Sequence, residues 1–169
     1  MRTVYTIGYE GTDIDRVIAT LKAVGIKLLA DVRAVAISRK KGFSKNALRA
    51  RLAAEGIAYE HYAALGDPKP GRVAAREGRH DEFLRIYSKH LFVPEVQGAL
   101  ALLAEATSKN TTCLLCFERD PKYCHRSLVV AKLEQQGISS FDLFGDLPRR
   151  YDNFAKLPRR HFGEGASAA

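Results

Sequence analysis

The stretch Thr111-Thr112-Cys113-Leu114-Leu115-Cys116-Phe117-Glu118-Arg119-Asp120-Pro121-Lys122-Tyr123-Cys124-His125-Arg126 combines an apolar run with a cluster of reactive side chains. The apolar half, Thr111 to Phe117, predicts a buried strand, and a helical pattern follows as far as Gln136. Such a strand-to-helix turn lies at the carboxyl edge of a sheet, where a helix N-terminus favours anions. We therefore expect the working edge of the protein here.

The rest of the chain alternates between strand and helix patterns around this stretch. Such alternation is typical of an α/β fold, and we predict three layers, with a mainly parallel sheet flanked by helices on both faces. The expected strands are 4–7, 27–32, 57–62, 111–117 and 139–144, and the expected helices are 13–24, 44–56, 81–90, 94–108 and about 121–136.

One domain over residues 1–146 accounts for this pattern, and residues 147–169 form a basic extension. The extension repeats Leu-Pro-Arg-Arg at 147–150 and 157–160, and its end from Gly163 is expected to be disordered. Residues 65–79 contain three glycines and two prolines, which indicates a long loop and a candidate lid.

The charge of the chain points to an anionic partner such as nucleic acid. Lys and Arg number 27 against 19 Asp and Glu, giving a formal net charge of +8 and a sequence pI of about 9.5. The excess is concentrated at 33–54, a range with seven basic residues and no acidic one. The alternative is a solvated surface without a ligand.

The cysteine count and the hydropathy pattern indicate a soluble cytoplasmic protein. Three cysteines, without a leader segment, favour a reduced compartment over a disulfide framework. No apolar stretch reaches the roughly 18 to 20 residues that a membrane helix needs.

The three cysteines differ in their predicted roles. Cys113 and Cys116 have C-x-x-C spacing, but residues three apart on a strand face opposite sides, so Cys113 is expected to be a buried apolar residue. Cys116 and Cys124 flank the turn, where a helix dipole and Arg126 lower the pKa of a thiol. Each is a candidate nucleophile or a structural thiol.

A zinc site at Cys116, Cys124 and His125 is not predicted. Successive residues on a helix diverge by roughly 100 degrees, so Cys124 and His125 would point apart. A divalent ion held by oxygen atoms stays open, and no cofactor is identified.

The other polar residues of the turn have two readings each. Glu118 is either a general acid or base or the partner of Arg126, and His125 is either a proton shuttle or a structural imidazole. Arg126 lies near a helix start, where a cation is disfavoured unless it binds an anion or a carboxylate.

The opposite wall of the site is expected from the first two strands. Asp31 and Arg33 project on one side at the end of the second strand, and Ser38 and Arg39 lie in the following loop. The first strand ends in Gly8-Tyr9-Glu10-Gly11, whose glycines allow backbone to approach a ligand, although this is no phosphate-loop signature.

These motifs resemble the family of domains of unknown function DUF488. The resemblance rests on 6–11, Asp31-Val32-Arg33, Ser38-Arg39, Phe43-Ser44 and the final C-x-E and C-H-R elements, and it runs from about Thr3 to Leu143. It implies an α/β domain without an established activity.

Three functions remain as hypotheses. The first is an enzyme on a phosphate-containing substrate, with Arg33, Arg39 and Arg126 holding the anion and Glu118, Cys124 or His125 performing the chemistry. The second is a non-catalytic nucleic-acid-binding module that stacks bases on Tyr9, Phe43 or Tyr62. The third is a thiol-dependent enzyme.

Overall fold

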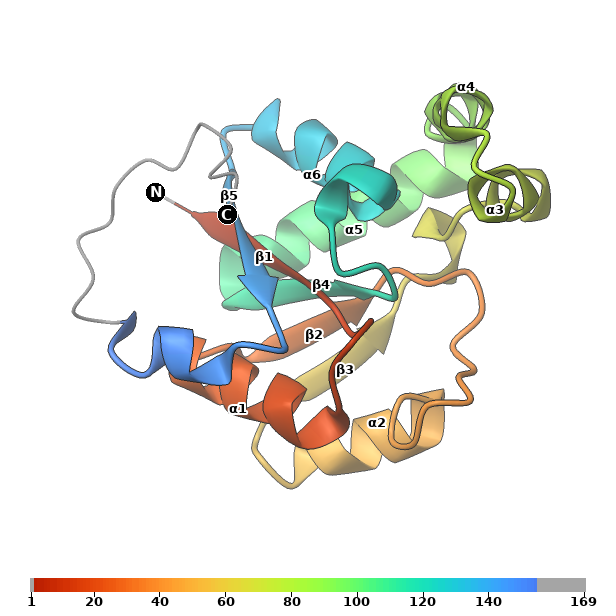
Figure 1. The fold of residues 1–169 in the computed structure, drawn as a ribbon. Coiled ribbons are helices and arrows are strands. Elements are labelled where there is room, and N and C mark those ends of the chain that lie inside the picture. The colour runs from red at the N-terminus through yellow and green to blue at the C-terminus, as the bar shows by residue number, and fades with distance from the viewer. Residues whose placement is uncertain (1, 155–169) are drawn as a thin grey trace.

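The computed structural model describes residues 2–154 and has an all-parallel five-stranded sheet in the order β3-β2-β4-β1-β5. Figure 1 shows helices on both faces, which confirms the predicted α/β fold. The strands are β1 (Thr3–Gly8), β2 (Leu28–Asp31), β3 (Ala58–His61), β4 (Thr112–Cys116) and β5 (Ser139–Phe144).

The helices form two layers around two apolar cores. α1 and α2 pack with one face of the sheet, and α4, α5 and α6 pack with the other. The helices are α1 (Ile14–Val24), α2 (Lys45–Ala53), α3 (Lys69–Arg76), α4 (His80–His90), α5 (Pro94–Lys109) and α6 (Arg126–Glu134), with short 3₁₀ turns η1 (Ala63–Leu65), η2 (Pro121–Tyr123) and η3 (Pro148–Tyr151).

Strand β4 shows how a central strand serves both cores. All five of its residues are buried. Cys113 and Leu115 pack with α1 and α2, while Leu114 and Cys116 pack with the opposite core. The predicted separation of Cys113 from Cys116 is therefore confirmed, because side chains alternate along a strand.

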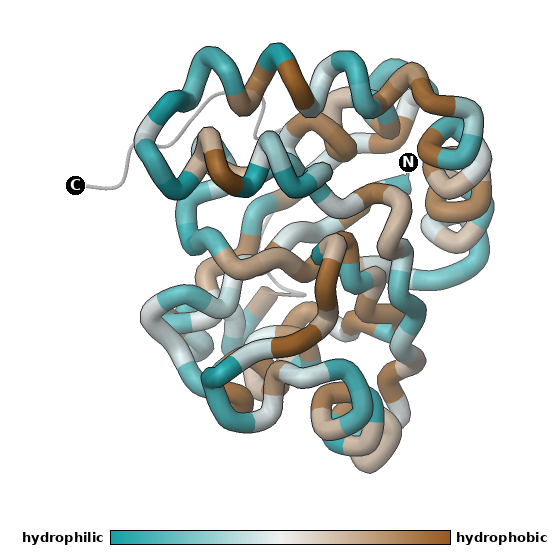
Figure 2. The backbone as a smooth tube through the Cα atoms, turned by 90° about the vertical axis from the view of Figure 1, so that its right-hand side faces the viewer, coloured by the Kyte–Doolittle hydropathy of each residue, from teal (hydrophilic) through white to brown (hydrophobic). Residues whose placement is uncertain are grey.

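Local signals account for the ends of α1. Asp13 is the N-cap residue and accepts a hydrogen bond from the Arg16 backbone N–H at 2.9 Å. Gly25 ends the helix with φ of 80°, a left-handed conformation that favours glycine. In Figure 2 the helices show bands of apolar and polar residues, as expected for helices that each bury one face.

The prediction of a long loop at 65–79 is wrong. Most of this segment forms α3, which packs against α4. Pro70 lies in the first turn of α3, where its missing N–H removes no helical hydrogen bond, and Gly71 is buried close to Phe83 and Ile86. The proline therefore starts a helix here, and the glycine allows close contact between two helices. The segment is not the long loop expected to act as a lid.

Residues just beyond 146 pack onto the domain. Tyr151 is buried, and its hydroxyl accepts a hydrogen bond from the Phe144 backbone N–H at 2.8 Å. Phe154 contacts the rings of Tyr5 and Phe141. The second Leu-Pro-Arg-Arg copy and the segment from Gly163 lie outside the described residues.

None of the helices within residues 2–154 has the length and apolar character needed to cross a membrane.

Candidate functional site

The predicted site residues lie at the ends of three neighbouring strands and in the segments that follow them. β4 lies between β1 and β2, so the segments after these strands meet at one edge of the sheet. β2 pairs directly with β4, so the segments after these two strands are neighbours at the edge. At this edge the structure separates the polar residues into two networks.

The first network surrounds Arg33, and we call Tyr9, Asp31, Arg33 and Tyr59 the arginine network. Arg33 Nε and Nη2 donate to the two carboxylate oxygens of Asp31 at 2.8 and 2.7 Å, and Nη1 donates to the Tyr9 hydroxyl at 3.1 Å. Tyr59 donates to the same carboxylate at 2.6 Å. Because Asp31 and Arg33 are both buried, this paired geometry offsets the cost of removing their charges from water.

Burial and proximity to Asp31 raise the pKa of Tyr59. Burial lowers the pKa of Arg33, but its bonds to Asp31 outweigh burial and leave it raised. Arg33 thus remains a cation with a carboxylate partner inside the protein.

The second network, which we call the cysteine cluster, consists of Cys116, Glu118, Cys124 and His125. His125 Nδ1 lies 3.8 Å from Cys116 Sγ and 3.9 Å from Cys124 Sγ. The Cys116 thiol donates to Glu118 Oε2 at 3.3 Å. Both sulfur atoms and the imidazole are buried, whereas Glu118 is partly exposed.

One hydrogen bond determines which imidazole nitrogen faces the sulfur atoms. His125 Nε2 lies 2.6 Å from the Val32 carbonyl oxygen, which only accepts hydrogen bonds, so Nε2–H is the donor. Nδ1 therefore carries the proton that the imidazole exchanges with its surroundings. That nitrogen points at both thiols.

The two thiols have opposite pKa shifts. Burial raises the pKa of Cys124, but the neighbouring Cys116 thiol and the charges of His125 and Arg126 outweigh burial and leave it well below the ordinary value. The neighbouring Cys124 and burial raise the pKa of Cys116. Cys124 is therefore the more acidic thiol of the pair.

The two proton carriers of the cluster have raised pKa values. Burial lowers the pKa of His125, but the Cys124 thiolate and the Asp67 carboxylate raise it to about 9. Burial and the Cys124 thiolate raise the pKa of Glu118 to about 7. The cluster thus sets the more acidic thiol against an imidazole that keeps its proton at neutral pH, beside a carboxyl group that exchanges protons.

The argument that Cys124 and His125 point apart is wrong. Cys124 has extended backbone (φ −125°, ψ 142°) between η2 and α6, and the helix begins only at Arg126, so helical divergence does not apply. One Sγ or Nδ1 atom from each of Cys116, Cys124 and His125 lies within 4.8 Å of the others. Among the described residues this is the group that can hold a thiophilic metal ion.

Arg126 has different partners from those expected. Its side chain is buried and donates to the backbone carbonyl oxygens of Glu118 at 2.5 Å and Arg119 at 3.1 Å, and to Thr6 Oγ1 at 3.2 Å. The predicted pairing with the Glu118 carboxylate is wrong, since that carboxylate accepts from Cys116. The Arg126 side chain therefore holds the turn in place by binding the backbone carbonyl groups of the turn.

The first strand supports the same turn. A Cβ atom on Gly8 would lie 1.7 Å from the Glu118 backbone oxygen, so the glycine allows close approach of protein backbone. The Glu10 carboxylate accepts from the Arg119 backbone N–H at 3.1 Å. Tyr9 is buried and stacks on Phe43, with ring centroids 4.3 Å apart.

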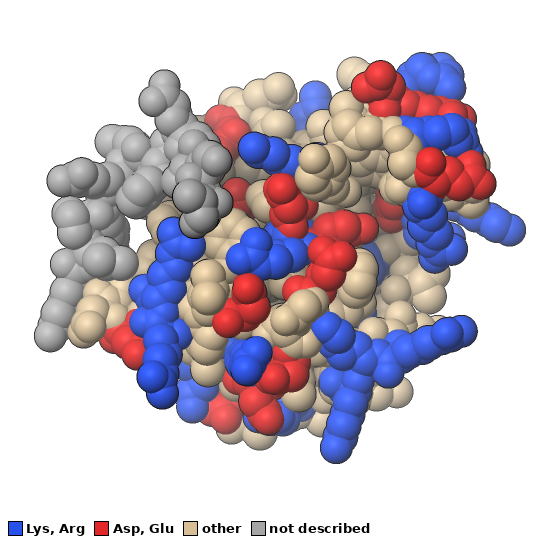
Figure 3. Space-filling view, viewed as in Figure 1, with Lys and Arg blue, Asp and Glu red and all other residues tan. Residues whose placement is uncertain are grey.

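The loop before α2 carries the basic side chains. Ser38 and Ser44 exchange hydrogen bonds across its base. Ser44 is the N-cap residue of α2, but its hydroxyl closes the loop and makes no cap hydrogen bond to the helix. Lys40 donates to the carbonyl oxygens of Tyr9 and Thr12, while Arg39 and Lys41 are exposed. Figure 3 shows basic side chains gathered over this loop and α2, at the lower right.

A known protein family matches most of the chain. The model of the domain of unknown function DUF488 matches residues 13–133, which is more than half of the chain. The chain belongs to the DUF488 family. The match is narrower than the predicted resemblance from Thr3 to Leu143; it includes both walls of the site but not Gly8 to Glu10.

No curated protein and no solved structure matches this DUF488 chain. Its chemistry is therefore argued from its own residues.

Two residues of the DUF488 site were not predicted from the sequence. Asp67 Oδ1 lies 3.8 Å from His125 Nδ1, and the Tyr87 ring lies 5.3 Å from the imidazole. Burial raises the pKa of Asp67, although the positive charge of His125 opposes this rise. The only local signal for Asp67 is its place between Gly66 and Pro68, which also fits an ordinary turn.

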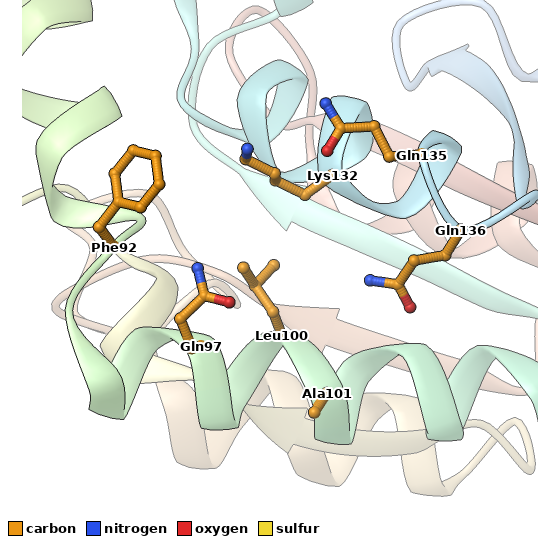
Figure 4. Close-up of a pocket in the computed structure, with 7 residues that line it drawn as sticks. All are labelled: Phe92, Gln97, Leu100, Ala101, Lys132, Gln135 and Gln136. Atoms are coloured by element: carbon orange, nitrogen blue, oxygen red, sulfur yellow. The ribbon is translucent and has the colours of Figure 1, made fainter.

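Two surface hollows of the DUF488 domain lie away from the cysteine cluster. One, of about 470 Å³, lies between α5 and α6 and is shown in Figure 4. It is lined by Phe92, Gln97, Leu100, Ala101, Lys132, Gln135 and Gln136. A broader hollow of about 910 Å³ lies beside β3, α2 and α5, and neither hollow is lined by a residue of the cysteine cluster.

Proposed function

We propose that this DUF488 protein is a thiol-dependent enzyme whose nucleophile is Cys124. The observation that carries the proposal is the placement of His125 Nδ1 against Cys124 Sγ, with Nε2–H bound to the Val32 carbonyl. A thiolate is the nucleophilic form of cysteine, and a neighbouring imidazolium stabilises it.

The other groups of the site assist the same thiolate. The Arg126 backbone N–H lies 3.5 Å from Cys124 Sγ at the start of α6, where the helix dipole also favours a negative charge. His125 holds a proton for the leaving group, and Glu118, the partly exposed member, exchanges protons with Cys116 and solvent.

A phosphate-containing substrate has less support than thiol chemistry. Two of the three arginines assigned to its anion, Arg33 and Arg126, are buried and donate to groups of the protein. Arg39 is the exposed one.

The second candidate function is the binding of an anionic partner, nucleic acid included, at a surface separate from the cysteine cluster. The supporting observation is the exposed basic set Arg39, Lys41 and Arg49, on the loop before α2 and on α2, a segment without acidic residues. Base stacking on Tyr9, Phe43 or Tyr62 is not part of this proposal, since all three rings are buried. Affinity for an oligonucleotide that falls steeply with salt supports this candidate, and a flat log–log salt plot contradicts it.

The thiol proposal is tested by the pH dependence of thiolate formation. The ultraviolet absorbance of thiolate detects Cys124 without requiring access, and iodoacetamide with peptide mapping assigns the reactive residue. We expect a thiolate at Cys124 below the ordinary thiol pKa, and His125→Gln to move its formation to higher pH because the imidazolium is removed.

Cys113→Ala is the matched control, because Cys113 lies on the opposite face of β4 and should leave the titration unchanged. An ordinary thiol titration for Cys124 contradicts the proposal. So does a stoichiometric metal ion in the purified protein that is lost in Cys124→Ala, since the thiols would then be ligands.

A further inference from the structure

Two thiols from separate elements meet at one imidazole. Cys116 ends β4 and Cys124 precedes α6, yet their sulfur atoms lie within 4.8 Å of each other and both contact His125 Nδ1. The third cysteine, Cys113, packs in the other core and takes no part in this pair.

The surroundings of the two thiols are suited to different tasks. Cys124 Sγ faces two donors, the His125 ring and the Arg126 backbone N–H, which favour a thiolate. Cys116 donates its proton toward the Glu118 carboxylate at 3.3 Å, which favours a thiol that is deprotonated on demand. One thiol is placed to attack first and the other to attack second.

We infer that this pair reduces small hydroperoxides and forms a Cys116–Cys124 disulfide as the oxidised state. The inference rests on the proposed thiol-dependent function and names its substrate class.

The first step transfers one oxygen atom to Cys124. Its thiolate attacks the distal oxygen of the hydroperoxide, the O–O bond breaks, and Cys124 becomes a sulfenic acid. The leaving alkoxide or hydroxide takes the proton of His125 Nδ1 and departs as an alcohol or water, so the sulfur is oxidised by two electrons and the peroxide is reduced.

The second step forms the disulfide. Glu118 accepts the proton of Cys116, whose thiolate attacks the sulfenic sulfur of Cys124, the S–O bond breaks, and hydroxide leaves as water with the proton from Glu118. A small dithiol then reduces the disulfide and is itself oxidised, which restores both thiols and returns a proton to His125.

The geometry limits the size of the oxidant. Cys116 is 5% exposed, Cys124 and His125 are each 2% exposed, and Glu118 is the member of the cluster that solvent reaches most. A protein disulfide is too large to contact either sulfur in this arrangement. A small hydroperoxide is only slightly larger than a water molecule. Small oxidants are therefore the class that the site admits.

The experiment treats the full chain with hydrogen peroxide and maps its cysteines by mass spectrometry. We expect a loss of two hydrogens that maps to Cys116 and Cys124. Cys116→Ala should stop at a sulfenic acid on Cys124, which dimedone traps, and Cys124→Ala should form neither product. Cys113→Ala is the control and should form the disulfide as the native chain does.

Glu118→Gln tests the role of this carboxylate in the second step. It should slow disulfide formation by about a hundredfold, the scale of a lost acid–base group. Peroxide consumption with dithiothreitol as the reductant should slow correspondingly.

Different results would overturn the hydroperoxide inference and the thiol-dependent function. A reactive Cys124 thiolate that never forms a disulfide with Cys116 overturns the hydroperoxide inference and leaves the thiol-dependent function standing. A disulfide that involves Cys113 also overturns the inference. A Cys124 that titrates as an ordinary thiol, or that holds a metal ion, overturns both.

Discussion

The arginine network and the cysteine cluster occupy the same edge of the sheet but use buried polar groups differently. In the arginine network, Asp31 and Arg33 form a two-pronged ion pair, with tyrosine hydroxyls on either side. In the cysteine cluster, four titratable groups face one another, and their protons have more than one place to reside.

This difference separates buried charges that stabilise the fold from buried groups that can take part in a reaction. A buried ion pair with fixed partners resists protonation changes, as the raised pKa of Arg33 shows. Coupled groups with a lowered thiol pKa and a carboxyl pKa near 7 change protonation within the physiological range. Burial alone therefore does not mark a reactive residue, and the nature of its partners does.

The largest expected effect comes from Gly8→Ala, which breaks the turn that supports the cysteine cluster. The new Cβ would overlap the Glu118 backbone oxygen, so we expect a loss of about 4 kcal/mol or more in the free energy of unfolding, or failure to fold. Urea denaturation measures the change.

Gly98→Ala is its control, since a Cβ there meets no atom within 4 Å inside α5. We expect it to be neutral or to stabilise by about 0.5 to 1 kcal/mol. If the Gly8→Ala protein is as stable as this control, the backbone of the turn can move to accept the new Cβ at little cost, which contradicts the prediction.

The next effect tests the arginine network through Asp31→Asn. The buried Arg33 cation loses its carboxylate partner, and we expect a loss of about 3 to 5 kcal/mol in urea denaturation. Where the variant folds, the thiolate titration of Cys124 should stay native, which would sharpen the separation of the two networks.

Asp15→Asn provides the matched comparison. Asp15 also pairs with an arginine, Arg51, but at the surface, so its loss should cost less than about 1 kcal/mol. Equal losses for the two variants would contradict the structural role of the buried pair.

The smallest effect concerns the pH dependence of stability in the cysteine cluster. Folding raises the pKa of Glu118 to about 7 from an ordinary value of 4.5, so the folded state favours the protonated carboxyl group. This contribution is complete below pH 4.5 and is lost as the pH rises through 7, by roughly 3 kcal/mol.

Glu118→Gln carries no such proton and should lack this part of the loss between pH 4.5 and 8. The comparison with the native chain matters because Cys116, Cys124 and His125 also face Glu118 or one another and contribute in both proteins. Glu10→Gln, at an exposed carboxylate of the same edge, is the control. Parallel stability curves for Glu118→Gln and the native chain would argue against a raised carboxyl pKa.

The strands and the site edge were predictable because they depend on short-range patterns. The apolar run before Cys116 and its alternation placed Cys113 and Cys116 on opposite faces, as the structure confirms. The 65–79 segment was misread because glycine and proline serve a helix start and a close contact as readily as a loop.

Partners across the chain were not predictable in the same way. The expected match between Arg126 and the Glu118 carboxylate failed because the guanidinium binds the backbone of the turn instead. Asp67 approaches His125 from a segment far away in sequence, and no spacing rule connects them.

The sequence by itself determined the α/β architecture, the membership of the DUF488 family and the edge at which reactive residues gather, since periodicity and motifs are local properties. Only the tertiary structure decided which of those residues are paired for stability and which are coupled for chemistry. The physical reason is that protonation depends on burial and on distances of a few ångströms between separate segments, such as Val32 and His125 or Cys116 and Cys124.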